Sequence, residues 1–160
     1  MEKIEISPIG IVHSPLKDPC GAPIQPAGGA DIEGQVEVFP EFEEGLKDVD
    51  GFTYIILLFH LNRSSGYNLT VTPFMDDTPR GLFATRAPRR PGGIGLSTVR
   101  VTGVEGNKIK VCELDILDGT PLLDIKPFVP EFDNRYEAKT GWLEKRAHQS
   151  RHKKADDRFA

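Results

Sequence analysis

Three arginines lie within five residues of one another near the middle of the chain, beside two prolines and three glycines. They belong to residues 83–97, which have the sequence FATRAPRRPGGIGLS. Guanidinium groups make paired hydrogen bonds to carboxylate or phosphate. Proline fixes the backbone, and glycine lets the main chain approach a ligand closely. The segment therefore indicates an anion-binding loop, and the alternative is an exposed turn with solvated arginines.

Two common phosphate-binding patterns do not fit this segment. A Walker loop needs Gly-Lys followed by Ser or Thr, which is absent after the glycines. A dinucleotide fingerprint needs Gly or Ala where Thr98 follows Gly93 and Gly95. The acidic-x-Gly-x-Gly pattern is also missing after the first expected strand, so we expect no Rossmann-type cofactor site.

A second group of chemically capable residues lies at an expected strand–turn–strand corner. Asp115, Asp118 and Asp124 alternate with apolar residues in LDILDGTP and LLDIKP. Carboxylates there can accept hydrogen bonds from a ribose, an amine or an arginine. The alternative is turn chemistry, in which Asp118 closes an Asx turn and Asp124 pairs with an arginine.

The histidines are weaker candidates. His60 follows six apolar residues, a position that suits either a strand-end histidine or a catalytic group. His148 and His152 are four residues apart and would share one face of a helix. Because no third ligand lies near them, we expect no metal site.

The composition predicts one cytoplasmic domain rich in turns. The chain has 160 residues, of which 16 are glycine and 13 are proline, which argues against a helical bundle. The longest apolar run, residues 54–59, is far shorter than the roughly 20 residues of a membrane span. The N-terminus lacks a signal-peptide pattern. Cys20 and Cys112 form no CxxC motif and are expected to be free thiols.

Charge is unevenly distributed along the chain. The net charge is −4, yet residues 139–160 contain seven basic and three acidic residues. Residues 78–104 contain five arginines and no acid. An acidic body with two basic surfaces favours a specific anionic partner.

The hydrophobic pattern predicts a mainly β fold, a single β-barrel or strongly curved sheet with long Pro/Gly-rich loops. We divide the chain into a barrel domain, residues 1–137, and a basic C-terminal tail, residues 138–160, that is helical or extended. A short helical segment is expected near residues 40–49, and residues 52–61 form a central strand buried on both faces. The other expected strands cover residues 4–12, 35–39, 69–73, 97–104, 108–114 and 122–126, with a further one that begins at residue 83. Residues 97–104 and 108–114 form the clearest hairpin.

The combined motifs resemble the TsaA-like (YaeB-like) family over about residues 4–130. The matching motifs are FATR at 83–86, RP at 90–91, IGLS at 94–97, LD at 114–115, DGTP at 118–121 and DIKP at 124–127. PIG at 8–10, SP at 14–15 and GL at 45–46 also match. The sequence departs from the family at Ala87, where Ser is usual, and at Gly92 and Gly93, where Asn-Pro is usual.

The resemblance implies a homodimeric β-barrel that binds S-adenosylmethionine, with sites near the interface. It also implies methyl transfer to N6 of threonylcarbamoyladenosine in the tRNA anticodon loop. The acceptor nitrogen must lose a proton, and His60, Asp115 and Asp118 are the candidate bases. Arg89 and Arg90 are candidates to hold the threonine carboxylate of the acceptor. The implied cofactor contacts are Pro23, Ile24, Gln25, His60, Leu61, Arg86, Leu96, Cys112, Glu113, Leu114 and Asp115.

Two other functions stay open from the sequence: a non-catalytic RNA-binding module, and a methyltransferase for a small anionic metabolite. The basic tail is expected to contact tRNA phosphates. Its removal should weaken tRNA binding and flatten the salt dependence, while cofactor affinity stays about the same. The alternative is that Trp142 and Leu143 dock the tail on a second subunit.

Overall fold

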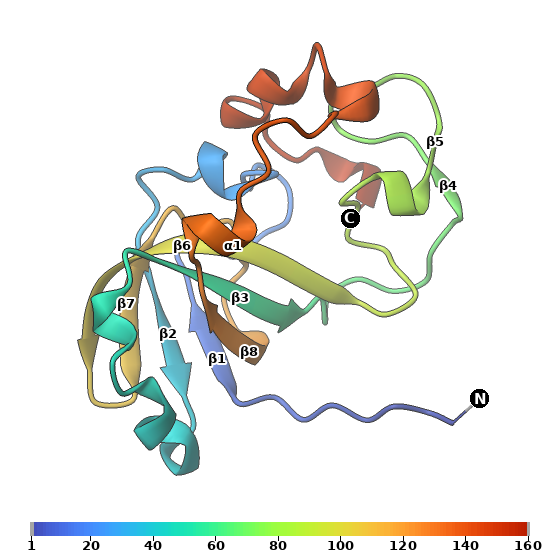
Figure 1. Ribbon diagram of the computed structural model, residues 1–160. Coiled ribbons are helices and arrows are strands. Elements are labelled where there is room, and N and C mark those ends of the chain that lie inside the picture. The colour runs from blue at the N-terminus through green and yellow to red at the C-terminus, as the bar shows by residue number, and fades with distance from the viewer. Residues whose placement is uncertain (1, 160) are drawn as a thin grey trace.

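The computed structural model describes residues 2–159 and consists of a closed six-stranded antiparallel barrel with the strand order β1-β2-β7-β6-β3-β8 (Figure 1). The predicted β-barrel is therefore confirmed. Two short strands outside the barrel pair with each other. The strands are β1 (Gly10–His13), β2 (Gly34–Val38), β3 (Tyr54–His60), β4 (Thr70–Val71), β5 (Arg80–Gly81), β6 (Ile94–Glu105), β7 (Lys108–Cys112) and β8 (Thr120–Pro127).

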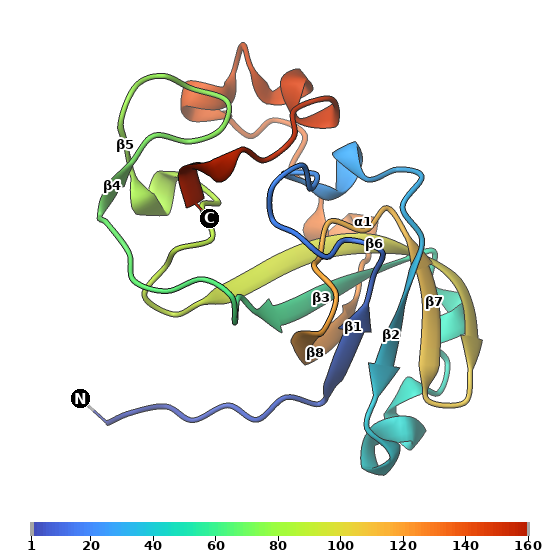
Figure 2. The same cartoon turned by 180° about the vertical axis from the view of Figure 1, so that it is seen from behind.

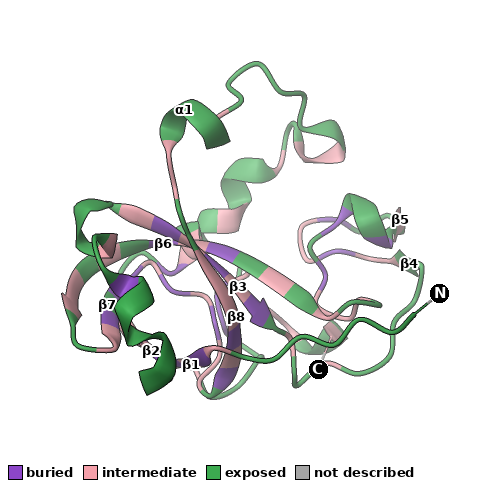
Figure 3. Ribbon diagram, turned by 60° about the horizontal axis from the view of Figure 1, so that its bottom comes forward, coloured by how far each residue is buried: buried purple, intermediate pink, exposed green. Residues whose placement is uncertain are grey.

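Alternating side chains build the barrel core, which is coloured as buried in Figure 3. On β3, Ile55, Leu57 and Phe59 point inward and are at most 7% exposed. The intervening residues Ile56 and Leu58 are only half-buried. The prediction that this strand is buried on both faces was wrong, because the barrel covers its inner face alone. The other core side chains come from every strand of the barrel and include Val12, Val36, Val38, Val99, Ile109, Val111 and Leu122.

The predicted hairpin is confirmed as β6 and β7, which pair from Arg100 opposite Cys112 to Glu105 opposite Lys108. Two other strand predictions were wrong. Residues 4–9 lie outside any strand, and Ile4 is 83% exposed because it extends past the barrel rim. The expected strand at residue 83 is a 3₁₀ turn, closed by the hydroxyl of Thr85, which donates to the carbonyl of Leu82 at 2.8 Å.

Helical structure is confined to short turns. Within residues 2–159 there is a single α-helix, α1 (Pro130–Asp133), and no helix there is long and apolar enough to cross a membrane. The helical segment expected near residues 40–49 is present as a 3₁₀ turn that begins at a proline. The 3₁₀ turns are η1 (Pro26–Gly28), η2 (Pro40–Leu46), η3 (Val49–Gly51), η4 (Leu82–Ala84), η5 (Gly141–Leu143), η6 (Ala147–Arg151) and η7 (Asp157–Phe159).

The C-terminal tail folds back onto its own chain. Figures 1 and 2 show it between the loop that contains η1 and the segment that carries β4 and β5. The indole N–H of Trp142 donates to the carbonyl of Ala84 at 2.8 Å. Arg146 forms an ion pair with the buried side chain of Asp76. The tail is therefore part of the folded unit in this chain.

Candidate functional site

The arginine-rich segment is shaped by one of its own arginines. The guanidinium of Arg90 donates to the carbonyl of Thr85 at 2.9 Å and lies 5.9 Å from the ring centre of Phe83. The N–H of Ala87 donates to the Thr85 hydroxyl at 3.2 Å, and Ala87 is buried. These contacts fix the turn from which Arg86 extends. Arg90 thus supports the loop, and its predicted contact with a substrate stays a prediction, as does that of the half-buried Arg89.

Arg86 meets the long Pro/Gly-rich loop that follows β1. Its Nη1 donates to Oε1 of Gln25 at 2.8 Å, across 61 residues of sequence. The Arg86 side chain is exposed and presents its charge at the surface. The structure therefore joins two of the segments that the resemblance assigned to the cofactor.

The positive charge of Arg86 acts on the carboxylate of Asp115. Its Oδ1 accepts a hydrogen bond from the hydroxyl of Ser97, on β6, at 2.6 Å. Burial raises the pKa of Asp115 to about 6, against the opposing effects of the Ser97 hydrogen bond and the positive charge of Arg86. A carboxyl group with this pKa changes its charge near neutral pH, as general bases do.

The residues before Asp115 cross from the end of β7 toward the Pro/Gly-rich loop. Glu113 has a φ of +63°, which is uncommon for a residue with a side chain and marks local strain. Its carboxylate accepts from the hydroxyl of Tyr54 and from Nε of Arg100, both at 3.2 Å. Leu114 is fully buried, and its N–H donates to the carbonyl of Ile32 at 3.3 Å. The chain is thereby held with Asp115 next to Ser97.

Gly29 allows the Pro/Gly-rich loop to approach the segment that contains Leu114. A Cβ added at Gly29 would lie 2.4 Å from the carbonyl oxygen of Leu114, closer than real contacts allow. A side chain at this position would displace the loop that carries Pro23, Ile24 and Gln25. Pro23 is buried, and it forms a β-bridge with Lys154 of the tail.

Of the remaining predicted contacts, Cys112 is a buried side chain at the end of β7, and the other three lie on β6 or at the end of β3. His60 ends β3 opposite Ile94, and a Cβ added at Gly93 would lie 3.3 Å from the His60 ring. The N–H of Leu61 donates to the Gly93 carbonyl at 2.7 Å. Leu96 is 50% exposed on the outer face of the barrel. Among residues 2–159, no hydrogen bond or ion pair joins His60 to Arg86 or Asp115, so the site has two parts along β6.

Gly93 also accounts for a departure from the family pattern. Its φ is +58°, which lies outside the range that proline can adopt. The family's usual proline therefore does not fit this backbone conformation. The segment reaches the His60 ring through a glycine instead.

The carboxylate of Asp118 is engaged in a hydrogen bond and an ion pair within the fold. Its carboxylate accepts from the N–H of Ser14 at 2.9 Å and pairs with Lys17 at 2.6 Å. The hydrogen bond from Lys17, together with that from Ser14, lowers its pKa. Arg63 donates to the main-chain carbonyl of Asp118 at 2.8 Å. Asp118 thus fastens the turn after β1 to the turn before β8, and a lowered pKa makes it a weaker base than Asp115.

The sequence did not predict the part that Ser97 and the C-terminal tail play at the candidate site. Ser97 stood at the end of a recognised motif, and the signal was a small polar residue at an inward position of a strand. The tail residues Lys154 and Ala155 gave no sequence signal for their pairing with the Pro/Gly-rich loop.

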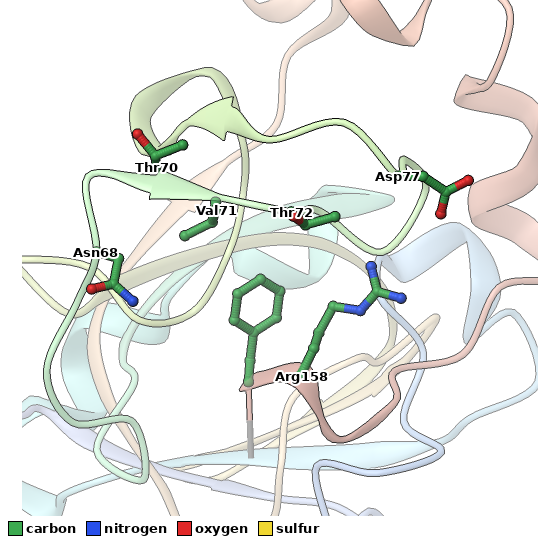
Figure 4. A pocket seen from close by; sticks show the side chains of 7 residues that line it. Asn68, Thr70, Val71, Thr72, Asp77 and Arg158 are labelled. Atoms are coloured by element: carbon green, nitrogen blue, oxygen red, sulfur yellow. The ribbon is translucent and has the colours of Figure 1, made fainter.

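Two cavities of the described chain lie away from this site. One, of about 490 Å³, separates Thr70, Val71 and Thr72 from Arg158 of the tail, and its lining side chains are exposed or half-buried (Figure 4). The other, of about 740 Å³, is an apolar groove between η2 and β8. Within the part of the chain that the structure describes, no three His, Cys, Asp or Glu side chains are placed to hold a metal. Both cysteines are free thiols.

The closed barrel and its loop-built site separate this chain from Rossmann-type methyltransferases. The chain belongs to the family of the tRNA-methyltransferase O N-terminal domain, whose model matches residues 11–134. A probable S-adenosyl-L-methionine-binding protein of Pyrococcus abyssi is 54% identical over 152 residues, which cover 95% of this chain and 83% of that relative. A tRNA (adenine(37)-N6)-methyltransferase of Mus musculus is 33% identical over 134 residues, 79% of this chain and 31% of the mouse protein.

A solved structure gives the same picture of the fold. The crystal structure of TrmO from Pseudomonas aeruginosa aligns with a TM-score of 0.75 at 35% identity. The alignment covers 88% of this chain and 63% of the TrmO chain. This chain therefore matches less than two thirds of the length of that protein.

Proposed function

We propose that this protein is an S-adenosylmethionine-dependent tRNA methyltransferase that transfers a methyl group to N6 of threonylcarbamoyladenosine in the anticodon loop. Family membership supports the methyltransferase class and the cofactor. The observation that carries the proposal is the proximity of two pairs from distant segments of the sequence. Gln25 is hydrogen-bonded to Arg86, Ser97 is hydrogen-bonded to Asp115, and the charge of Arg86 acts on Asp115.

The groups at this meeting point fit the chemistry of S-adenosylmethionine, which supplies a methyl group on a positively charged sulfur. Arg86 would bind the methionine carboxylate, because a guanidinium makes paired hydrogen bonds to carboxylates. Asp115 would accept hydrogen bonds from the amino group or the ribose. Ile24 and Leu96 offer apolar surface for the purine, and strand-end main chain offers its hydrogen-bond partners.

Asp115 is our preferred candidate for the base that receives the N6 proton. Its raised pKa places the switch between the charged and neutral forms near working pH. Ser97 orients the carboxylate by donating to one oxygen, which leaves the other oxygen for a second partner. His60 is the alternative base, because its exposed ring lies beside Gly93 at the other part of the site.

The acceptor is proposed to be tRNA, in the cytoplasm. Arg89 and Arg90 are our candidates for the threonine carboxylate, and Arg90 also donates to the loop's own carbonyls. Exposed lysines of the tail, among them Lys145 and Lys153, would contact phosphates.

A homodimer is also proposed. Ile94 and Leu96 are 46% and 50% exposed on the outer face of β6, and they lie across from the outward residues of β3. Exposed apolar side chains grouped on one face of a sheet are typical of an interaction surface. A second copy on this face would cover the part of the site near His60.

The test of the function uses S-adenosylmethionine with a labelled methyl group, offered to bulk tRNA and to a small-molecule extract. We expect the label in tRNA, at a threonylcarbamoylated adenosine identified by mass spectrometry of the nucleosides. Label only in the extract would support a metabolite methyltransferase. No transfer, together with tight tRNA binding and no cofactor binding, would support a non-catalytic RNA-binding module.

A further inference from the structure

We propose that the C-terminal segment, residues 141–159, is a positioning element that connects the two loops bearing Gln25 and Arg86 and holds them in cofactor-binding geometry. The proposal rests on the proposed function for the role of these two residues. It replaces the expectation that the tail has no influence on cofactor affinity.

The first contact of the C-terminal segment is with the Pro/Gly-rich loop. The N–H of Gly21 donates to the carbonyl of Ala155 at 2.8 Å, and the N–H of Ala155 donates to the carbonyl of Ala22 at 2.9 Å. Pro23 and Lys154 complete a β-bridge. Gly28 faces the main chain of the same segment, because a Cβ there would lie 2.9 Å from the carbonyl oxygen of Ser150. The loop is therefore held at two places around Gln25.

The second contact is with the loop that leads into the arginine-rich segment. The Arg146 guanidinium donates to Oδ1 of Asp76 and to the carbonyl of Met75, the latter at 2.9 Å. The Asp76 side chain is 1% exposed and also pairs with Arg80 at 2.7 Å. Arg158 donates to the carbonyl of Pro73 at 2.8 Å. Leaving a buried carboxylate without its arginine partners is strongly unfavourable, so this contact is a firm anchor.

The third contact lies two residues from Arg86. The Trp142 indole donates to the carbonyl of Ala84 at 2.8 Å, and the Arg80 guanidinium lies 5.7 Å from the centre of its ring. The C-terminal segment thus spans from the loop of Gln25 to the turn before Arg86. These two residues are themselves joined by a hydrogen bond of 2.8 Å.

The consequence follows from the cost of ordering flexible loops. Neither loop has β-ladder pairing with the barrel at Gln25 or Arg86, so the conformations of each are restricted by loop contacts, among them those with the C-terminal segment. Ordering them at the moment of binding would weaken affinity. A segment that orders both beforehand raises the fraction of protein in the binding-competent state.

The experiment compares four full-length variants with the wild type by calorimetric titration of S-adenosylhomocysteine and by amide hydrogen exchange. Arg146→Gln removes the anchor on Asp76, and Arg146→Lys restores its charge. Arg151→Gln is the matched control, because it makes the same charge change at an exposed side chain of the same segment. Trp142→Phe disrupts a second, independent contact of the segment, because it keeps an aromatic ring but removes the hydrogen bond to Ala84.

We expect Arg146→Gln and Trp142→Phe to weaken S-adenosylhomocysteine binding by roughly fivefold or more, the lower end of typical site-to-site coupling. Arg146→Lys should recover part of the loss, and Arg151→Gln should bind like the wild type. The amides of Gly21 and Ala155 should exchange faster in Arg146→Gln. Wild-type affinity in both breaking variants would overturn the proposal, whatever their rates of amide exchange.

The two proposals fail in different ways. If the wild type binds no S-adenosylhomocysteine, the proposed function fails, whereas the exchange of Gly21 and Ala155 still tests the connection between the loops. If the wild type binds and the two breaking variants bind equally well, the proposed function stands and the positioning role is refuted.

Discussion

Replacing Asp115 by Asn should stabilise the protein above pH 6 and remove part of the pH dependence of folding. Burial raises the pKa of Asp115 from 3.8 to about 6 in the folded state. Between these values the folded state binds more protons than the unfolded state. The stability of the wild type therefore falls as pH rises through this window. An asparagine side chain keeps the oxygen that accepts from Ser97 but carries no charge.

The size of the expected stabilisation follows from the shift in the pKa of Asp115. A shift of about 2 pKa units corresponds to about 3 kcal/mol, the full cost of charging the carboxyl in the fold. Because Asp115 is partly exposed, solvent screening reduces the cost, and we expect about 1 to 2 kcal/mol at about pH 7.5. Below about pH 4 this penalty disappears, since the carboxyl is protonated in both states.

The assay is urea unfolding of the wild type and Asp115→Asn from about pH 4 to 8, with the difference in unfolding free energy plotted against pH. The control is Asp156→Asn, because the hydrogen bond from Arg158 lowers the pKa of Asp156. Its difference curve should be flat between about pH 5 and 8, where Asp156 is ionised in both the folded and the unfolded state. A flat curve for Asp115→Asn as well would refute the account of this carboxyl group.

Three further perturbations test the roles of the loops and the tail. Asp118→Asn should change stability by less than about 1 kcal/mol in thermal melts and leave cofactor affinity unchanged, because it breaks an ion pair between a half-buried carboxylate and an exposed lysine; a large loss of affinity would return Asp118 to the site. Gly29→Ala should destabilise the fold by about 1 to 3 kcal/mol and weaken cofactor binding, since its Cβ would meet main chain. Gly45→Ala, where a Cβ meets open space, is the control for both measurements. Exchanging Lys145 and Lys153 for Gln should flatten the salt dependence of tRNA affinity by about one unit of slope for each phosphate that the tail no longer neutralises; equal slopes would mean that these lysines touch no phosphate.

Much of the fold could be predicted from the sequence because the barrel strands follow an alternating pattern. The β6–β7 hairpin has clean alternation and a Gly-Asn turn, and both features are local. The strand expected at residue 83 was wrong because a hydroxyl-to-carbonyl bond closes a 3₁₀ turn there. Ile9 still bonds to the main chain of Leu122 and Phe39, whereas residues 4–8 have strand-like residues but no strand pairing among the described residues.

The candidate site could be predicted from the sequence only where its residues belong to the motifs of the family resemblance. Gln25, Arg86 and Asp115 came from the family resemblance, and the structure brings them into one region. The role of Ser97 depends on which way its side chain points, and that is decided by pairing with β3.

The tail could not be placed from sequence at all. Its basic composition favoured a phosphate-binding arm, but two of its arginines are occupied within the chain. Arg146 pairs with a buried aspartate, and Arg158 pairs with Asp156 and stacks on Phe74. Long-range contacts such as those of Arg146 with Asp76 and of Arg158 with Phe74 leave no periodic pattern in a sequence.

The most direct test of the central claim is calorimetric titration of S-adenosylmethionine into the wild type, Arg86→Ala and a control. Arg135→Ala serves as the control, because this exposed arginine bonds only to nearby carbonyls among the described residues. Loss of a charged hydrogen-bond partner worth about 1.5 to 3 kcal/mol predicts a loss of affinity of roughly 10- to 150-fold in Arg86→Ala. Arg135→Ala should bind like the wild type. Equal affinity in the wild type and Arg86→Ala would contradict the claim that the cofactor binds where Gln25, Arg86 and Asp115 meet.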